Sequence, residues 1–408
     1  MGFPTSRKPS RENQSLPMLP SKKAKEVRLQ KRPQTFFSLC GCLGFLLFGL
    51  FPTTGLAQAQ TEKPAKHASA GSIIDAHAHL HPRVWRFTIQ VMDRNGLDIV
   101  VNLSGGSSEQ RMRVNQQITE LSKGRIVHFF TPSYRNIDDP NWGLQQAENL
   151  RLAVQKYGYR GLKISKALGL GVRWESGVLV PIDDPTFFPL WEMAGRLGVP
   201  VAIHTADPRA FWEPLTPENE RYDELAEHPS WSYYKRHQSG DVPSWLELLA
   251  AMEELVRLFP ETPFIGVHFG NAPERLDLVE HMLETYPNFY VDLAARLGEI
   301  GRHAPTRVRK LFLRYQDRIL FGTDIGINPY GLMLGAPGPV PAKPHDIKPF
   351  YDLHWRWLET NDAPMPHPVP IQGNWSISGL GLPESVLKKI YRTNALHLLR
   401  LHGAKPRK

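Results

Sequence analysis

The sequence predicts a (β/α)8 TIM barrel with long loops after the fifth and eighth strands, on two observations. Eight short apolar runs alternate with segments of helical periodicity between residues 73 and 402. Apolar strands separated by amphipathic helices need a parallel sheet that is covered by helices. Eight such units are the number that closes into one barrel, so this part of the chain is expected to be one domain.

The eight runs are short and apolar, and we expect them to be the barrel strands: 73–80, 98–104, 125–131, 160–165, 199–204, 263–268, 288–293 and 318–323. Between them, Ser244 and Glu247 form a capping box, and apolar residues then recur at helical spacing as far as Phe259. Another helix is expected to start at residues 271–273, with Pro273 near its first turn and one apolar face: Leu276, Val279, Met282 and Leu283.

Two connections are long, one after His204 and the other after Asp324. Both follow the carboxyl ends of strands, where barrels of this kind carry their active sites, so we expect lids there. The first loop also carries aromatic residues that either form an apolar lid over a ring-bearing substrate or pack the loop against the barrel: Trp212, Trp231, Tyr233 and Tyr234.

The basic charge of the chain is concentrated at its N-terminus. Residues 1–33 hold nine basic and two acidic residues, a net +7 of the formal +9 for all 408 residues. The remainder holds 40 basic and 38 acidic residues, which gives no reason to expect a nucleic-acid partner. The two cysteines, Cys40 and Cys42, leave no disulfide framework or thiolate metal site further along the chain.

The N-terminal segment has the features of an export signal. A short apolar run at 36–51 follows the basic residues, and small residues precede a cleavage point after Ala59. We therefore expect 1–59 to be a leader and signal peptide, 60–72 a linker, and 73–402 a barrel exported to the periplasm or secreted, without membrane contact after cleavage. An uncleaved anchor is the alternative, although the run is shorter than the ~20 residues of a membrane span.

A cluster of histidines and one aspartate predicts a metal site. His77 and His79 lie two apart on a strand, so both side chains point to one face, although such a pair alone also describes two interior histidines or chance. His204 and His268 end the fifth and sixth strands, and Asp324 follows the eighth, at the same end of the barrel. Imidazoles with a carboxylate suit Zn²⁺, with Fe²⁺ and Mn²⁺ left open. A metal with an open position lowers the pKa of its bound water to ~7.

This constellation resembles the amidohydrolase superfamily, in its amidohydrolase-related (amidohydrolase 2) branch. The resemblance rests on D-A-H-A-H at 75–79, the histidines that end strands five and six, and G-T-D at 322–324. It covers residues 73–402 and includes Y-R-T-N-A at 391–395, of the kind that closes such domains. The branch includes both hydrolases and decarboxylases, such as dicarboxylate lactonases and aminocarboxymuconate-semialdehyde decarboxylase.

The resemblance implies roles for the clustered residues. His77, His79 and His204 would hold one divalent metal together with Asp324, which would also shuttle a proton to or from the metal-bound water. His268 would orient or deprotonate that water, or polarise the substrate. Asp75 is expected to face the same way as His77 and to support the metal site.

Other candidates are more ambiguous. Lys163 on the fourth strand can be a carbamylated bridge between two metal ions, a cation that binds a substrate carboxylate, or a lysine paired inside the barrel mouth. Arg296 and Arg302 follow the seventh strand, and Tyr134 and Arg135 follow the third, so each can reach the pocket rim. An arginine fork suits a carboxylate, and the alternative for each is a solvated charge in a loop.

Taken together, these features favour a metal-dependent hydrolase that activates water to attack the carbonyl of an amide, ester or lactone. A non-oxidative decarboxylase on the same site is the alternative. An exported binding protein that has lost catalysis is a third, which the five filled positions do not favour. The substrate is expected to be a small molecule, a carboxylate or a cyclic compound among the candidates, and a homo-oligomer is left open. No P-loop, nucleophile elbow or dinucleotide fingerprint is found in the sequence.

Overall fold

The computed structural model describes residues 73–338 and 340–401. The chain divides into two units, 1–61 and 62–408, and the fold below belongs to the second. The predicted leader and linker at 1–72 lie outside the described residues, as does His402 at the end of the predicted barrel. No helix within the described ranges is sufficiently long and apolar to cross a membrane.

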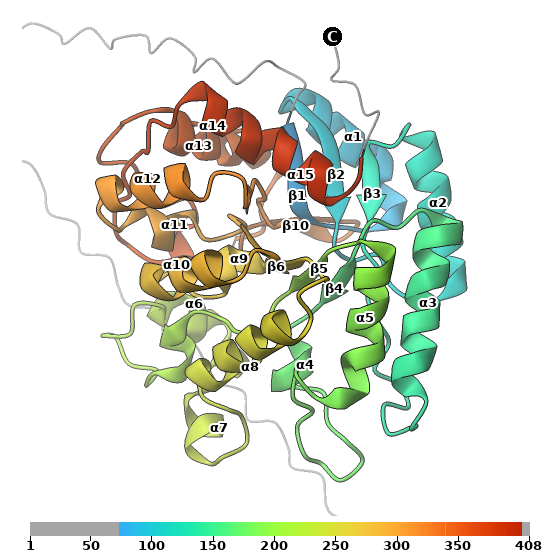
Figure 1. Ribbon diagram of the computed structural model, residues 1–408. Helices are drawn as coiled ribbons and strands as arrows, with labels where there is room; N and C mark the ends of the chain where they lie inside the picture. The colour runs from blue at the N-terminus through green and yellow to red at the C-terminus, as the bar shows by residue number, and fades with distance from the viewer. Residues whose placement is uncertain (1–72, 339, 402–408) are drawn as a thin grey trace, which may run out of the picture. The chain divides into compact units, whose positions relative to one another are not determined.

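Short parallel strands form two sheets in the middle of the molecule (Figure 1). The first contains β1, β2 and β3 in that order, and the second contains β4 to β8 in sequence order. The strand bounds are β1 (Ile73–Leu80), β2 (Leu97–Asn102), β3 (Ile126–His128), β4 (Leu162–Ile164), β5 (Val201–Ile203), β6 (Phe264–Gly266), β7 (Phe289–Asp292) and β8 (Ile319–Leu320).

Backbone contacts join the two sheets at both seams. Between β3 and β4, a parallel bridge links Phe130 to Leu162. Between β8 and β1, the Ala76 N–H donates to the Phe321 carbonyl at 2.9 Å. Eight parallel strands therefore follow one another around a ring in chain order, and the predicted (β/α)8 barrel is confirmed.

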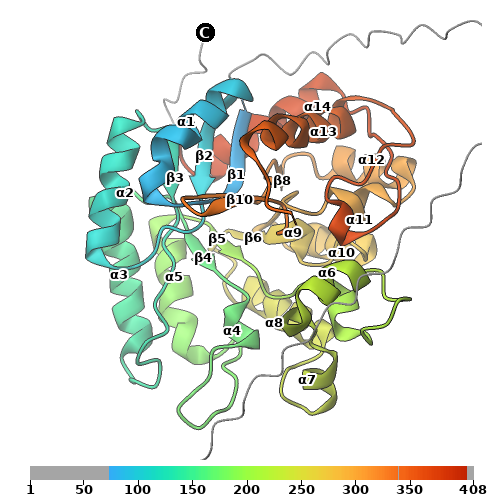
Figure 2. The same ribbon diagram turned by 180° about the vertical axis from the view of Figure 1, so that it is seen from behind.

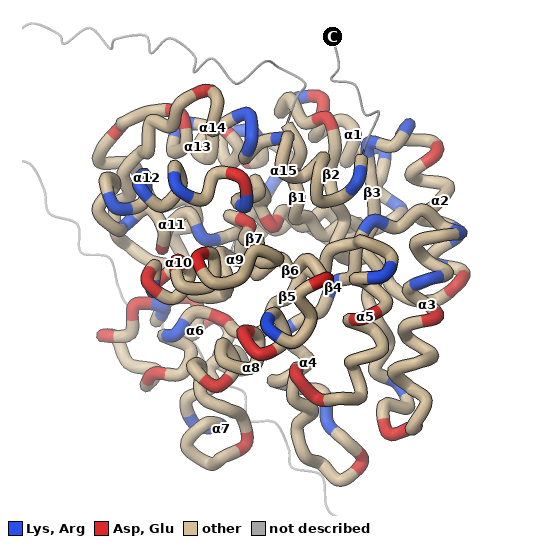
Figure 3. The backbone as a smooth tube through the Cα atoms, in the orientation of Figure 1, with Lys and Arg blue, Asp and Glu red and all other residues tan. Residues whose placement is uncertain are grey.

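Helices cover the outside of this ring, and the charged residues lie mainly on those helices and their loops (Figures 2 and 3). Small and branched side chains fill the inside of the barrel: Ile74, Val101, Val127, Ala202, Ile265 and Leu320. The longer outer helices are α1 (Trp85–Arg94), α2 (Glu109–Leu121), α3 (Trp142–Tyr157), α5 (Phe188–Leu197), α8 (Trp245–Leu258), α10 (Leu276–Thr285), α12 (Pro305–Arg314) and α13 (Ile347–Glu359). Shorter helices are α4 (Ala167–Leu170), α9 (Val267–Gly270), α11 (Leu297–Gly301), α14 (Glu384–Lys388) and α15 (Asn394–Leu398).

The capping box of α8 is confirmed, because the Ser244 hydroxyl accepts from the Glu247 N–H and the Glu247 carboxylate accepts from the Ser244 N–H. The predicted start of the next helix at 271–273 is wrong, since α10 begins at Leu276. Asn271 instead has a left-handed backbone with φ of 58°, and its side-chain oxygen accepts from the Thr205 N–H at 3.1 Å. Asparagine tolerates that conformation, so here it joins two loops and does not open a helix.

Both long loops contain secondary structure. The loop after β5 carries α6 (Tyr222–Glu227) and α7 (Tyr234–Gln238). The chain after Asp324 forms an antiparallel hairpin of β9 (Ile325–Asn328) and β10 (Gly331–Leu334), and β9 pairs in parallel with β1. The hairpin thus prolongs the barrel wall beyond the carboxyl ends of the strands, above the predicted site.

Candidate metal centre

A bulge in β1 determines which of its side chains face the barrel mouth. In the pairing with β2, the register shifts between Asp75 and Ala78, so β1 carries an extra residue there. The expectation that Asp75 faces the same way as His77 is therefore wrong. The Asp75 carboxylate points outward and accepts a hydrogen bond from the Tyr351 hydroxyl of α13 at 2.8 Å.

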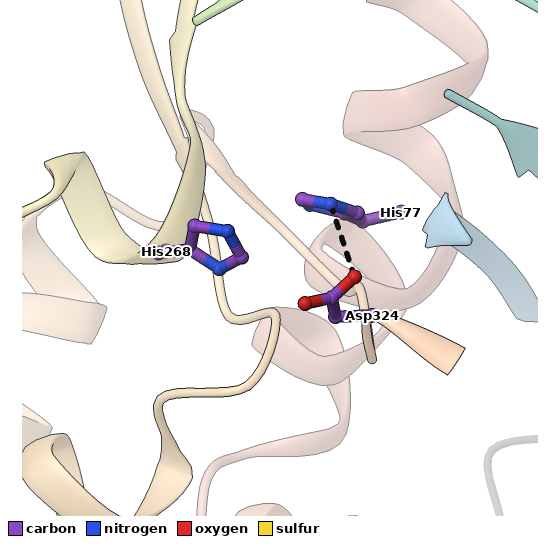
Figure 4. A group of neighbouring side chains, drawn as sticks. All are labelled: His77, His268 and Asp324. Atoms are coloured by element: carbon purple, nitrogen blue, oxygen red, sulfur yellow. Dashed lines mark ion pairs between the residues drawn. The ribbon is translucent and has the colours of Figure 1, made fainter. Parts of the chain in front are cut away.

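The histidines of β1 converge on Asp324. His77 Nε2 lies 3.5 Å and His79 Nε2 3.3 Å from the same oxygen, Asp324 Oδ1. Figure 4 shows His268 across from His77 and Asp324. One potential ligand atom from each of His77, His268 and Asp324 lies within 4.8 Å of the others, which is a spacing that one metal ion can bridge.

His204 joins the cluster from β5. Its ring lies 4.4 Å from the ring of His268, and the His268 ring lies 5.0 Å from that of His77, measured between centroids. The His204 Nε2 atom lies 3.4 Å from Asp207 Oδ1. The structure thus brings all five predicted residues together, although His79 and His204 lie at the edges of the closest group.

The ring nitrogens are oriented by their outer partners. His268 Nδ1 lies 2.8 Å from the Ala294 carbonyl and His77 Nδ1 2.8 Å from the Asp292 carboxylate, so each must donate a proton. His79 Nδ1 lies 2.6 Å from the Ser104 hydroxyl. A neutral imidazole that donates from Nδ1 keeps its lone pair on Nε2, which is the form a metal ligand needs.

Several inner atoms are buried without a hydrogen-bond partner among the described residues: His77 Nε2, His204 Nε2, Asp324 Oδ1 and Lys163 Nζ. Buried polar atoms in folded proteins are nearly always hydrogen-bonded, so an unpartnered group of this kind needs an explanation. Three of the four are lone-pair donors that face one space. These residues fit a divalent metal ion.

The ionisation states suit the same role. Burial lowers the pKa of His268 well below its usual value and that of His204 to about 4, so both rings are neutral at pH 7. Burial opposes ionisation of Asp324, but the nearby imidazoles of His77 and His79 outweigh it and lower the Asp324 pKa to about 2. His204 and His268 are therefore neutral imidazoles, and Asp324 is a carboxylate.

The backbone at the site is strained. His268, Phe269 and Asp324 have left-handed φ angles of 55°, 57° and 62°. Such conformations cost non-glycine residues of order 1–3 kcal/mol each and persist only where other contacts impose them. Here the Asp292 carboxylate accepts from the His268 N–H at 2.8 Å, and the His77 carbonyl accepts from the Asp324 N–H at 2.9 Å.

Asp292 is a site residue that the sequence prediction missed. Its carboxylate accepts from His77 Nδ1 and from the His268 and Ala294 N–H groups, so it holds two of the clustered residues at once. The signal was available, because Asp292 lies at the carboxyl end of the seventh strand, as His204 and His268 lie at the carboxyl ends of the fifth and sixth.

Lys163 points into the barrel beneath the cluster and is 4% exposed. Burial lowers its pKa to about 8, although the charges of Asp292 and Asp324 act in the opposite direction. Its Nζ atom has no hydrogen-bond partner within the described part of the chain, so a paired lysine is not what the structure presents.

A pocket of about 160 Å³ opens above the cluster. Its polar lining comes from several loops: Lys166, His204, Asp207, His268, Arg296 and Asp324. Lys166 is ion-paired to Asp207 at 2.5 Å. Arg221 also lines the pocket but is paired with Glu224 and Glu299.

Arg296 is buried, and the one hydrogen bond of its guanidinium within the described ranges is from Nη1 to the adjacent Ala295 carbonyl. It is therefore the pocket cation with the most donors available. The other candidates lie elsewhere: Arg302 pairs with Glu220 and stacks on Trp375, while Tyr134 packs against Trp142. Arg135 is not among the pocket-lining residues.

The aromatic residues of the first loop divide between two roles. Trp231 and Phe211 line the pocket. Trp212 and Tyr233 are buried and hydrogen-bonded, to the Pro243 carbonyl and the Asp207 carboxylate respectively, so they pack the loop onto the barrel. Only Trp231 of the four predicted residues can contact a molecule in the pocket.

An eight-stranded parallel barrel with histidines and an aspartate at the strand ends defines a class of enzymes that use a divalent metal. The chain belongs to the amidohydrolase family: the family model Amidohydro_2, described as amidohydrolase, matches residues 135–401, more than half of the 408 residues. No curated protein matches the chain.

Several solved structures are similar to it. One is the 2,6-dihydroxybenzoate decarboxylase from Rhizobium, with 17% identity, coverage of 81% of this chain and 99% of that chain, and a TM-score of 0.46. Another is a dihydroxybenzoic acid decarboxylase from Polaromonas sp. JS666 with bound manganese and the inhibitor 2-nitroresorcinol, at 15% identity, 81% and 97% coverage and a TM-score of 0.47. A third is a putative amidohydrolase from Staphylococcus aureus, at 16% identity, 80% and 99% coverage and a TM-score of 0.47.

Proposed function

We propose that the protein is a metal-dependent hydrolase with one divalent ion, Zn²⁺ as the best match to its imidazole and carboxylate donors. The observation that carries this proposal is the orientation of the histidines. Their Nδ1 atoms have partners, while the Nε2 atoms of His77 and His79 lie within 3.5 Å of one unpartnered oxygen of Asp324. His77, His79, His204 and Asp324 would hold the ion.

When bound, such an ion supplies Lewis acidity, which polarises a carbonyl oxygen and lowers the pKa of a water molecule. His268 is buried and neutral, and its Nε2 has no hydrogen bond within the described residues, so it can accept a proton from the attacking water. Asp324 is ionised, so it can itself accept a proton from the water and deliver it to the leaving nitrogen or oxygen. Lys163 and Arg296 place positive charge at and below the pocket, where they favour an anionic group of the substrate.

A non-oxidative decarboxylase is the second candidate, and a specific observation favours it. Arg296 lines the small pocket and its guanidinium makes one hydrogen bond among the described residues, so its remaining donors can form a fork that suits a carboxylate. In a decarboxylase this carboxylate would be the group that leaves, whereas in a hydrolase it would serve only for binding.

Reaction in H₂¹⁸O separates the two. The metal-loaded protein would be given lactones and amides beside aromatic and enol carboxylates, with ¹⁸O incorporation and CO₂ release measured together. We expect ¹⁸O in the product acid and no CO₂, and loss of turnover in Asp324→Asn. His281→Gln, on an outer helix, is the matched control and should keep full activity. CO₂ release without ¹⁸O incorporation would overturn the hydrolase assignment.

We also propose that the enzyme works after export, because a basic leader and an apolar run precede the barrel. N-terminal sequencing of the protein recovered outside the cytoplasm should begin at Gln60. Recovery of the protein with its leader intact in a membrane fraction would mean that the segment is an uncleaved anchor.

A further inference from the structure

A second cavity adjoins the metal pocket. This groove has a volume of about 1020 Å³ and lies between α6, β10 and the chain around residues 368–371. It is open to the surface, and it is about six times larger than the 160 Å³ pocket over the histidines. Ligand pockets usually measure roughly 300–1,000 Å³, so the metal pocket alone is small for a whole substrate.

The hairpin strand β10 separates the two cavities. Successive side chains of a strand point to opposite faces, and the lining residues follow this alternation. Met333 and Gly335 line the metal pocket, whereas Leu332 and Leu334 line the groove. The strand is therefore a wall with one face toward each cavity.

Two further elements contribute to both sides. In α6, Glu224 lines the metal pocket while Asp223 and Glu227 line the groove. At the other wall, Gln372 lines the pocket and Ile371 the groove. Each wall of the groove is thus continuous with a wall of the metal pocket.

The cavities meet beyond the end of β10, where Ala336 and Pro337 line both. Gly335, the residue before them, has φ of +80°, and a Cβ there would come within 3.0 Å of the Val369 side chain. The chain therefore turns closely over the floor of the groove at this point. The two cavities are thus adjacent compartments that meet at the C-terminal end of β10, where they share Ala336 and Pro337.

The compartments differ in chemistry. The metal pocket contains a cluster of ionisable groups, whereas apolar side chains contribute much of the groove lining: Leu332, Leu334, Ala336, Pro337, Val369 and Ile371. Ionisable residues also line the groove, with both signs of charge present: Asp223, Glu227, Lys343, His345 and Asp346. The apolar part of this lining favours a hydrocarbon group.

We propose that the substrate is amphiphilic, with a small polar head that reacts in the metal pocket and an apolar arm that lies in the groove. This inference rests on the proposed function, since it assumes that the metal pocket is the reacting compartment. The occupant of the groove is then the hydrocarbon part of the same molecule whose head lies at His268 and Asp324.

Binding of unreactive probes tests the inference without turnover. A series of straight-chain carboxylates from acetate to octanoate would be titrated calorimetrically into the metal-loaded protein. Affinity should rise about three-fold for each methylene that enters the groove, below the ~four-fold of full burial because the groove is open. Chain-length independence, or no binding of octanoate at millimolar concentration, would overturn the inference.

Variants assign the effect to the groove. Leu334→Glu should abolish the chain-length dependence and leave acetate affinity unchanged, and Ile371→Glu on the opposite wall should do the same if the first variant folds poorly. Leu144→Glu, at an exposed leucine of α3, is the matched control and should retain the full dependence. Unaltered dependence in both groove variants would refute the assignment.

The outcomes also separate this inference from the proposed function. Chain-length-dependent binding without any hydrolysis would keep the groove and reject the hydrolase. Metal-dependent hydrolysis without chain-length dependence would do the reverse. Concentration-dependent self-association that is lost in Leu334→Glu would assign the groove to a second copy of the chain and overturn the proposal.

Discussion

Two buried polar clusters on β1 lie on opposite sides of the barrel wall, and they differ in whether their polar atoms have hydrogen-bond partners. On the outer side, the Asp75 carboxylate accepts from the Thr323 hydroxyl, the Thr323 and His77 N–H groups and the Tyr351 hydroxyl, at 2.6–3.1 Å. On the inner side, His77 Nε2 and Asp324 Oδ1 are buried and have no hydrogen bond within the described residues.

This difference separates a structural cluster from a binding cluster within one strand. Burial raises the pKa of Asp75 to about 6, and its hydrogen bonds partly offset that effect. The outer cluster therefore holds β1 to the turn at Thr323 and to α13, with every oxygen satisfied. The inner cluster keeps lone pairs without partners and is complete only when something else binds them.

The largest expected effect is on the inner cluster. His79→Ala removes a donor whose Nε2 faces Asp324, and metal affinity should fall more than about 100-fold, beyond the ~10–100-fold typical of a supporting partner. Because the variant loses only the hydrogen bond to Ser104 and a 3.3 Å contact with Asp324, the free energy of unfolding of the metal-free protein should change by less than about 1 kcal/mol. Elemental analysis and urea denaturation measure the two quantities.

His81→Ala, two residues further along, is the matched control and should retain the metal. Stoichiometric metal in purified His79→Ala would remove this residue from the ligand set. A large loss of metal-free stability would show that the inner cluster also holds the fold.

For the outer cluster we expect the opposite result, a large loss of stability. Asp75→Ala leaves the Thr323 and Tyr351 donors buried without an acceptor, and the free energy of unfolding should fall by about 3–4 kcal/mol. Asp75→Asn keeps one acceptor oxygen and should lose about 1 kcal/mol. Urea denaturation of the metal-free proteins gives both values. Equal stability of Asp75→Ala and the parent would mean that this cluster is not structural.

Asp292 combines features of the two clusters. Its carboxylate is fully hydrogen-bonded, like that of Asp75, but it supports the inner cluster by holding His77 and His268. Asp292→Asn would turn an amide donor toward His77 Nδ1 and so favour the ring tautomer with its proton on Nε2. Metal affinity should fall about 10–100-fold while the backbone bonds to His268 and Ala294 remain. NMR of labelled histidine reports the tautomer, and an unchanged tautomer with unchanged affinity would refute this role.

The sequence predicted the inner cluster better than the outer one, for physical reasons. Strand ends meet at one rim of a parallel barrel, so His204, His268 and Asp324 could be placed together from strand order alone. The orientation of Asp75 could not, because one extra residue in β1 inverts the alternation of side chains and leaves no mark in the sequence.

The hairpin was also missed. Its strands β9 and β10 are short, and residues 325–334 were expected to belong to a loop. Their pairing depends on contact with β1, which is distant in sequence. Asp292 was within reach of the prediction, since an aspartate at a strand end is the same signal that identified Asp324.

The smallest expected effect concerns how the free energy of unfolding falls at acid pH, and it comes from a histidine in the helices outside the barrel. His354 of α13 is 2% exposed, and burial lowers its pKa to about 4, from about 6.5 in the unfolded chain. The unfolded state then binds the proton more readily, so His354 leaves stability intact above pH 6.5 and reduces it as the pH falls toward 4. The loss should be about 2 kcal/mol by pH 5.

His354→Leu should flatten this part of the pH profile in urea denaturation, whereas the exposed His345→Gln should leave it unchanged. The metal-free protein is the sample to use, because protonation of the inner histidines would release a bound metal and add its own acid sensitivity. If His354→Leu keeps the parental slope between pH 6.5 and 5, His354 is not the source of the acid sensitivity, and other buried groups such as Asp75 determine that slope.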